Sequence, residues 1–206
     1  ILVQPESFTA VVGVEGQMSV SAVGLKPVVY QWYKNGTAIA GATKPVLNLE
    51  VISLEAAGDY EVEVANSLGT TRSQISYLKV LEPPVLKGGL DSAMVNLGDL
   101  HKFSLIANGT EPIQVEWYKD GEVIEGQDTM VLNLPSVQKA DGGQYHVRLV
   151  NSGGEFVSEP ARLSLNLAVE IVSGLKDRTV RVGTDVVLSV EAEGARPFTY
   201  RWFFND

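Results

Sequence analysis

Apolar and polar residues alternate with a period of two through most of the chain. The clearest stretch has Tyr60, Val62 and Val64 alternating with Glu61 and Glu63. No segment keeps the 3.6-residue period of an amphipathic helix, and Gly, Pro and Asn-Gly turns separate the alternating stretches. The pattern predicts an all-β chain of short strands, each with one buried face.

The alternating stretches recur as one sequence unit. Trp32, Trp117 and Trp202 lie 85 residues apart, and their neighbours repeat in the same register. A unit of this length can enclose its own hydrophobic core, whereas repeats of 20 to 50 residues cannot. Each unit is therefore predicted to be a domain, and the fold class is a series of tandem β-sandwiches.

We expect two complete domains, residues 1–81 (the first repeat) and 82–166 (the second repeat). Residues 167–206 (the third repeat) hold only the N-terminal half of the unit. Core strands without a facing sheet are prone to aggregate. We therefore expect that the natural polypeptide continues beyond Asp206, or that another chain donates the missing strands.

Each complete unit predicts a two-sheet sandwich of seven or eight strands. Its expected core combines the central tryptophan, a tyrosine of a later strand and apolar residues of the facing strands. The predicted core residues are Trp32, Trp117, Trp202, Tyr60, Tyr145, Val20, Val62, Leu105, Val147 and Val190. Asn35-Gly36 and Asp120-Gly121 predict tight hairpins, because these residue types accept positive φ at both turn positions.

These residues resemble an immunoglobulin-like domain of the I-set type. Trp32 lies 12 positions after Val20, which stands at the place of the first immunoglobulin cysteine. Val62 stands at the place of the second cysteine, two residues after the tyrosine that would form the tyrosine corner. The resemblance implies that apolar pairs replace the disulfide in the core.

The second repeat reads D-G-G-Q-Y over residues 141–145, close to the D-x-G-x-Y signature of the same family, while Ala56 replaces the aspartate in the first repeat. The chain is similar to the tandem cysteine-free immunoglobulin-like repeats of large bacterial surface and secreted proteins. This resemblance implies a non-enzymatic stalk, spacer or adhesive module. Its expected location is extracellular or at the cell surface, with the export signal and anchor outside this segment.

Two alternative functions fit the same resemblance. The first alternative is an ancillary carbohydrate- or protein-binding module of a secreted enzyme. The second is an intracellular scaffold, because the I-set modules of muscle proteins such as titin also lack obligatory disulfides. The chain has no cysteine, so cysteine usage does not indicate a compartment.

The charge pattern excludes two classes of partner. The formal net charge is −9, and the 16 basic residues are scattered singly. A surface without a basic stripe favours neither nucleic acid nor direct membrane binding. His101 and His146 lie at different positions of the repeat, and we expect both to be solvent-exposed on strands. Neither has a second histidine or a cysteine nearby in the sequence. We therefore predict no catalytic residue, no metal and no cofactor.

Tyr33, Tyr118 and Phe203 directly follow the three tryptophans and alternate to the outer face. They form the only repeated exposed aromatic position and are the candidates for a lateral contact, with packing on a neighbouring strand as the alternative. Expected partners are the neighbouring domains, a second copy of the chain, or a surface protein or glycan. The junctions at residues 80–85 and 165–169 are short and rich in proline or apolar residues, which predicts semi-rigid linkage.

Overall fold

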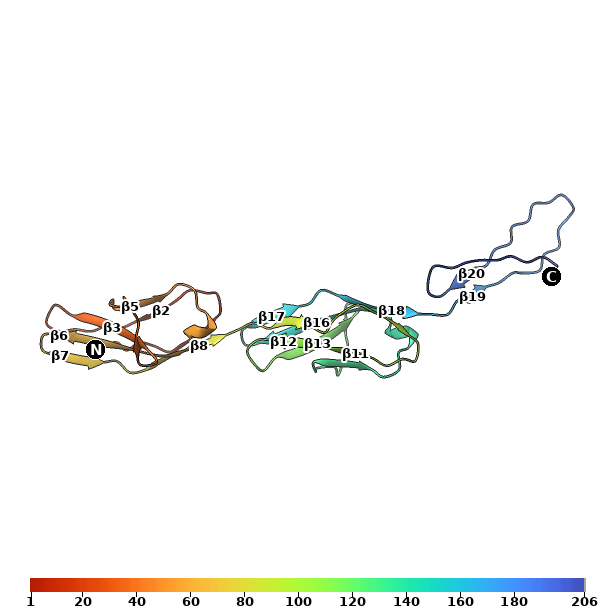
Figure 1. The fold of residues 1–206 in the computed structure, drawn as a ribbon. Helices are drawn as coiled ribbons and strands as arrows, with labels where there is room; N and C mark the ends of the chain where they lie inside the picture. Colours follow the sequence, from red (N-terminus) through yellow and green to blue (C-terminus); the bar gives the residue numbers. More distant parts are fainter. Residues whose placement is uncertain (206) are drawn as a thin grey trace. The chain divides into compact units, whose positions relative to one another are not determined.

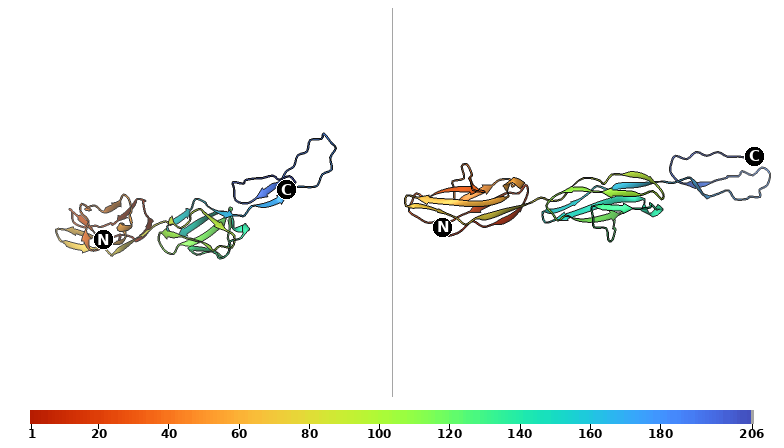
Figure 2. Two further views of the ribbon diagram at one scale, coloured as in Figure 1. Left: turned by 45° about the vertical axis from the view of Figure 1, so that its right-hand side comes forward. Right: turned by 60° about the horizontal axis from the view of Figure 1, so that its bottom comes forward.

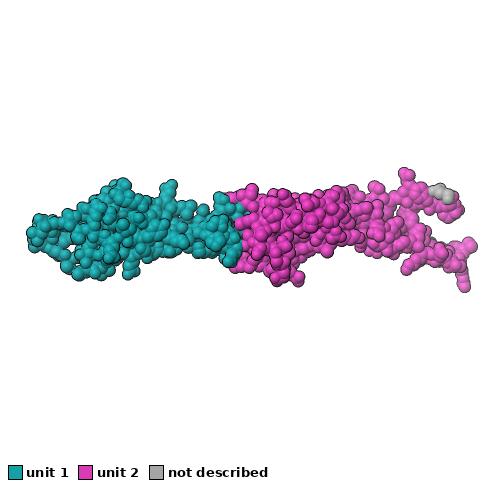
Figure 3. All heavy atoms as spheres, turned by 90° about the horizontal axis from the view of Figure 1, so that it is seen from below, with its two compact units in different colours: residues 1–86, 107–114, 149–156 teal, residues 87–106, 115–148, 157–206 magenta. Residues whose placement is uncertain are grey.

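The computed structural model describes residues 1–205, in which strands form nearly all of the regular structure (Figure 1). The all-β prediction is confirmed. Two compact units are present (Figure 3). One comprises Ile1–Leu86, Ala107–Gln114 and Leu149–Phe156, and the other comprises Lys87–Ile106, Val115–Arg148 and the described residues from Val157 on. The domain boundaries expected from the repeat remain a prediction.

The first repeat contains eight strands and one short 3₁₀ helix. Their bounds are β1 Phe8–Val11, β2 Gly16–Ser19, β3 Val29–Lys34, β4 Thr37–Ala38, β5 Val46–Leu49, η1 Leu54–Ala56, β6 Gly58–Asn66, β7 Gly69–Arg72 and β8 Ser76–Leu81. The larger sheet has the order β1-β8-β6-β3-β4, with β7 also paired to β6, and β2 pairs with β5 in a smaller sheet. Strand β1 runs parallel to β8.

The second repeat has counterparts of all these elements and two further strands, β9 and β12. Their bounds are β9 Val85–Gly88, β10 Ala93–Asn96, β11 His101–Ser104, β12 Ile106–Asn108, β13 Gln114–Lys119, β14 Glu122–Val123, β15 Val131–Leu134, η2 Lys139–Asp141, β16 Gly143–Asn151, β17 Gly154–Val157 and β18 Ala161–Asn166. The larger sheet again has the order β10-β18-β16-β13-β14, with β17 on β16. Strand β11 pairs with β15, and β12 pairs with β9. The third repeat adds β19 Glu170–Ser173 and β20 Glu191–Glu193, which pair with each other.

The core of the first repeat lies between its two sheets, which can be followed in Figure 2. Met18 and Leu47 come from the smaller sheet and pack with Trp32 and Val62 of the larger one. Trp32 and Val62 are cross-strand neighbours in the β3–β6 ladder and are both 0% exposed. The apolar alternation of the sequence is therefore the inward face of the sandwich.

Both central tryptophans are fully buried, and both indoles have a hydrogen-bond partner. The Nε1 atom of Trp32 donates to the Lys44 carbonyl and that of Trp117 to the Thr129 carbonyl, each at 2.9 Å. The predicted core residues that lie in the first two repeats are all buried, namely Trp32, Trp117, Tyr60, Tyr145, Val20, Val62, Leu105 and Val147. A buried indole N–H without an acceptor would be costly, so this repeated bond fixes the orientation of each ring.

The third repeat differs from the core prediction. Trp202 is 53% exposed, and Val190 is half-buried. Residues 167–205 contain counterparts of only the first half of the unit, so nothing here corresponds to the strands that cover Trp32 and Trp117. Burial of these side chains requires the facing sheet and does not follow from the local alternation.

The two predicted hairpins are confirmed. Asn35 and Gly36 have φ values of 48° and 76°, and Asp120 and Gly121 have values of 51° and 90°. The flanking Lys34 pairs with Thr37 across the first turn, so the loop has two residues. The helical segments of residues 1–205 include none with the length and hydropathy needed to cross a membrane.

Candidate functional site

The outer face of the first repeat carries a cluster around Tyr33. The Arg72 guanidinium lies 4.5 Å from the centroid of the Tyr33 ring. Its Nη1 donates to Glu61 Oε1 at 2.8 Å and its Nε to Glu63 Oε2 at 3.2 Å. The hydrogen bond to Glu63 raises the pKa of Arg72. Tyr33 is therefore half-buried under a cation and is not a freely exposed ring.

The second repeat covers the equivalent tyrosine in a different way. Tyr118 stacks on His146, with ring centroids 4.6 Å apart, and its hydroxyl donates to Glu116 Oε2 at 3.1 Å. Arg148 Nη1 donates to the same oxygen at 3.0 Å. The hydrogen bond from Arg148 lowers the pKa of Glu116, and the hydrogen bond to Glu116 raises the pKa of Tyr118.

The three residues proposed for a lateral contact therefore lie in three different settings. Tyr33 and Tyr118 pack against side chains of adjacent strands, whereas Phe203 is 69% exposed. The polar partners on these faces are not repeated, because Glu61 and Glu63 correspond to His146 and Arg148. Sequence alternation placed all these side chains outward but did not indicate that they pair.

A hydrogen-bonded clamp holds the chain where the second repeat begins. The Glu82 carbonyl accepts from the Thr110 amide at 3.0 Å, and the Glu82 amide donates to Thr110 Oγ1 at 2.8 Å. Asn151 Nδ2 donates to the Glu82 and Thr110 carbonyls, both at 2.8 Å. Asn151 Oδ1 accepts from the amides of Gly153 and Gly154 at 2.8 and 3.1 Å. One side chain thus connects the junction segment to two turns.

Glycines allow the junction segment to approach these turns closely. A Cβ on Gly109, which has a φ of 147°, would lie 2.9 Å from Pro84 Cα. A Cβ on Gly153 would lie 2.9 Å from the Glu82 carbonyl carbon and oxygen. Any larger residue at either position would displace backbone, so the contact requires glycine.

Related bonds occur in the other repeats. Asn66, the counterpart of Asn151, donates to the Leu25 carbonyl at 3.2 Å, and its Oδ1 accepts from the Leu68 amide at 2.9 Å. In the third repeat the Ala195 amide donates to the Leu167 carbonyl at 2.9 Å, as Thr110 does to Glu82. In the sequence, the only sign of these asparagine bonds is the repeated Asn-x-x-Gly spacing at residues 66–69 and 151–154. That spacing is equally expected for a simple turn, so it did not predict the bonds.

Both histidines are half-buried, so the expectation that they are solvent-exposed is wrong. His146 is covered by the Tyr118 ring. His101 packs against Phe103 with ring centroids 4.7 Å apart, and its buried Nε2 has no hydrogen-bond partner. Within residues 1–205, no group of three His, Asp or Glu side chains is close enough to hold a metal ion.

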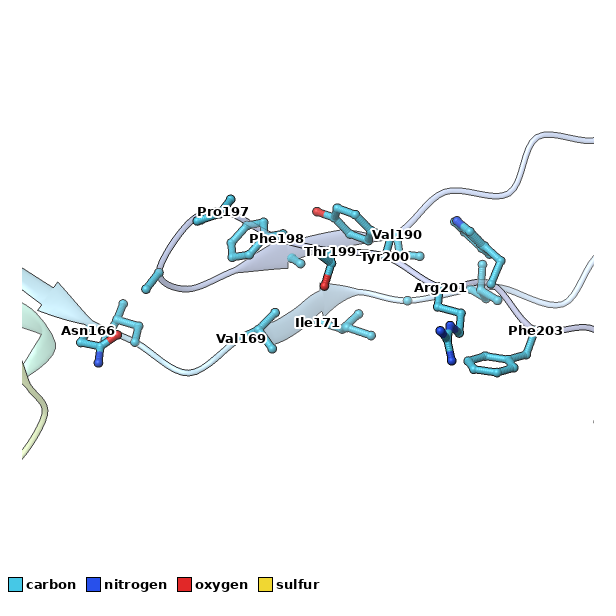
Figure 4. Close-up of a pocket in the computed structure, with 16 residues that line it drawn as sticks. Asn166, Val169, Ile171, Val190, Pro197, Phe198, Thr199, Tyr200, Arg201 and Phe203 are labelled. Carbon is cyan, nitrogen blue, oxygen red and sulfur yellow. The ribbon is translucent and has the colours of Figure 1, made fainter.

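The third repeat contains an apolar groove of about 890 Å³ (Figure 4). Ile171, Val190, Phe198, Tyr200 and Trp202 are among the residues that line it. These residues correspond to the inward face of the complete repeats, so the groove is the open side of an incomplete core.

The comparison with known protein families agrees with this architecture. Residues 84–165 match the Immunoglobulin I-set domain. The chain is 22% identical to the I-band fragment I67-I69 from titin, with a TM-score of 0.64, covering 95% of this chain and 75% of that fragment. The tandem immunoglobulin-like fold is therefore confirmed.

The curated relatives are long animal proteins. Muscle M-line assembly protein unc-89 of Caenorhabditis elegans is 30% identical over 85% of this chain, and Hemicentin-1 of Homo sapiens is 25% identical over 98%. The chain spans only 2% and 4% of their respective lengths. These comparisons give no support to a bacterial source, and they do not assign a partner to this segment.

Proposed function

We propose that the chain is a non-enzymatic, rod-like segment of a long immunoglobulin-repeat protein, serving as a stalk, spacer or adhesive module outside the cell. The Glu82 clamp carries this proposal. A flexible tether has no need of a side chain that bonds the junction segment to two turns, whereas a spacer with an ordered junction does. The net charge of −9 fits the same role, because it favours a soluble module without a nucleic-acid or membrane partner.

The bacterial setting is part of the proposal and rests on the resemblance to cysteine-free bacterial surface repeats. Protease treatment of intact producing cells tests the location. Loss of the protein on brief treatment, with a cytosolic marker retained, supports a surface location. Full protection in intact cells, with digestion after lysis, contradicts it.

Small-angle scattering of the 206-residue chain tests the spacer role separately. A spacer with fixed junctions gives one narrow distance distribution, and Asn151→Ala broadens it because Glu82 loses a bond from that side chain. Asn66→Ala is the matched control. Asn66 bonds to the Leu25 carbonyl and the Leu68 amide of the first repeat, so its loss should leave the distribution unchanged. An equally broad distribution for the wild-type chain and Asn151→Ala would argue against a fixed spacer.

A muscle-type intracellular scaffold is the second candidate. The similarity to unc-89, a protein named for muscle M-line assembly, favours it. The two candidates predict opposite outcomes in the protease experiment on intact cells. A glycan-binding screen of the same chain would reveal the third possibility, an ancillary binding module of a secreted enzyme.

A further inference from the structure

Two repeats hold the segment that precedes them by the same main-chain bond. In the second repeat the Thr110 amide donates to the Glu82 carbonyl at 3.0 Å, and in the third the Ala195 amide donates to the Leu167 carbonyl at 2.9 Å. Thr110 and Ala195 hold the same position of the repeat, and so do Glu82 and Leu167. The bond therefore belongs to the repeat unit and not to one particular junction.

A glycine lets the same segment lie against the loop in both repeats. A Cβ on Gly109 would lie 2.9 Å from Pro84 Cα, and a Cβ on Gly194 would lie 2.9 Å from Val169 Cα. Pro84 and Val169 each come two positions after the residue whose carbonyl accepts the bond. Because these contacts are made to main-chain atoms, the loop recognises an extended backbone and tolerates different side chains on it.

The first repeat has the same loop glycine and turn asparagine. Gly24 and Asn66 are the counterparts of Gly109 and Asn151. A Cβ on either glycine would lie 3.0 Å from the Nδ2 atom of its asparagine. The loop and the turn of the first repeat are therefore as close to each other as those that hold Glu82.

Asn66 has the donor capacity for a carbonyl from outside the repeat. A side-chain amide nitrogen carries two N–H groups. Asn66 Nδ2 donates to the Leu25 carbonyl, as Asn151 Nδ2 does to the Thr110 carbonyl, and Asn151 gives its second N–H to the Glu82 carbonyl. A carbonyl at the corresponding place on the first repeat would meet the second N–H of Asn66 and the Leu25 amide.

Exposed apolar side chains surround these donors. Val23, Leu25 and Leu68 are 73%, 59% and 81% exposed. Val23 and Leu68 also line a pocket of about 280 Å³ with Gly24 and Asn66. The counterparts of the three apolar residues in the second repeat are Asn108, Thr110 and Gly153. Neighbouring apolar side chains of such exposure indicate a contact with another protein surface.

Building on the proposed spacer function, we propose that a first-repeat socket, made of Val23, Gly24, Leu25, Asn66 and Leu68, binds an extended junction segment of another immunoglobulin repeat. The Leu25 amide and Asn66 Nδ2 donate to one main-chain carbonyl of this segment, and the residue two positions later packs against Gly24. Leu25 lacks the hydroxyl that its second-repeat counterpart has, but the third-repeat counterpart is an alanine whose amide still binds its carbonyl. The apolar rim then packs on the repeat that supplies the segment.

Amide exchange followed by nuclear magnetic resonance tests the socket in the 206-residue chain extended at its N-terminus. One version carries a copy of residues 79–85 directly before Ile1, which places the copied glutamate in the register that Glu82 has in the second repeat. The control carries a Gly/Ser extension of the same length. A covalent extension raises the effective concentration of the segment, so weak docking is measurable. Exchange of the Leu25 amide should be about tenfold slower with the junction copy than with the Gly/Ser extension. Equal exchange rates in the two chains would refute the proposal.

A blocking variant assigns the protection to the socket. Gly24→Val places a side chain where the counterpart glycine of the second repeat touches Pro84, so the junction copy should no longer slow the Leu25 amide. Gly174→Val is the matched control, because a Cβ there meets nothing within 4 Å, and it should keep the tenfold difference. Each variant is measured with both extensions, which cancels any effect of the new valine on intrinsic exchange.

Protection that survives Gly24→Val, or that disappears in Gly174→Val, overturns the assignment to the socket. If Gly24→Val does not fold, the comparison of the two extensions on the unsubstituted chain still decides whether the segment docks. The spacer role is tested separately by the scattering of Asn151→Ala, where the Glu82 bond is lost. The socket and the spacer role can therefore fail independently.

Discussion

Replacing Asn151 by alanine removes the side chain that connects the junction segment to two turns. The amide nitrogen loses its bonds to the carbonyls of Glu82 and Thr110, both at 2.8 Å. The carbonyl oxygen no longer accepts from the amides of Gly153 and Gly154. Four hydrogen bonds are therefore lost at one half-buried position.

The expected cost follows from the number of bonds. A hydrogen bond contributes a net ~1 kcal/mol, and water replaces part of that at half-buried groups, so Asn151→Ala should lower the free energy of unfolding of the second repeat by about 2–3 kcal/mol. Asn66 makes only two corresponding bonds, at 3.2 and 2.9 Å. Asn66→Ala should cost the first repeat about half as much, on the order of 1–1.5 kcal/mol.

Native-state hydrogen exchange at neutral pH measures both costs in the same chain, with β16 peptides for Asn151→Ala and β6 peptides for Asn66→Ala. Each variant should leave the other repeat unchanged, because neither asparagine bonds across to the other's turn. A cost for Asn151→Ala no larger than that for Asn66→Ala would show that the Glu82 and Gly154 bonds add nothing to stability. The clamp would then have no energetic basis.

Three further outcomes follow from burial and pairing. Trp117→Ala should cost about 3–5 kcal/mol in urea unfolding, whereas Trp202→Ala should cost far less, since Trp202 is 53% exposed. Ser158→Ala leaves the buried Val147 amide without its 3.0 Å acceptor and should cost about 1–3 kcal/mol by the same assay. Burial raises the pKa of Tyr145 to about 12, above the ordinary value near 10. The folded state therefore keeps this proton longer than the unfolded state, stability falls as pH rises from about 10 to 12, and Tyr145→Phe should remove that loss in alkaline unfolding curves.

Much of the fold follows from local sequence. The alternation around Tyr60 and Val62 specifies the inward face of β6, and Asn35-Gly36 supplies the backbone conformations of a two-residue turn. Both features depend on residues next to each other in the chain. Burial of Trp202 could not be predicted in the same way, because it requires strands that residues 167–205 do not contain.

The side-chain bonds of the junction clamp and of the outer faces could not be predicted from the sequence for a different physical reason. Asn151 and Glu82 are 69 positions apart, and their bond depends on how the β16–β17 turn meets the start of β9. Arg72 and Arg148 both neutralise a glutamate near a tyrosine, yet they come from different strands of the unit. Alternation shows which side a residue faces and carries no information on which neighbour its charged end reaches.

Packing of apolar residues replaces most of the stability that a disulfide would give this fold. The absence of cysteine therefore does not indicate where the protein is located. Val20 and Val62 stand at the cysteine positions of the first repeat and are 6% and 0% exposed. Burying each valine contributes about 1.5–3 kcal/mol, while a disulfide closing a loop of about 43 residues would contribute roughly 4 kcal/mol in the entropic model. Leu105 and Val147, at 8% and 0%, repeat the arrangement. Because packing offsets most of the missing bridge, the domain can fold in a reducing or an oxidising compartment, and the protease experiment on intact cells distinguishes a surface stalk from an intracellular scaffold.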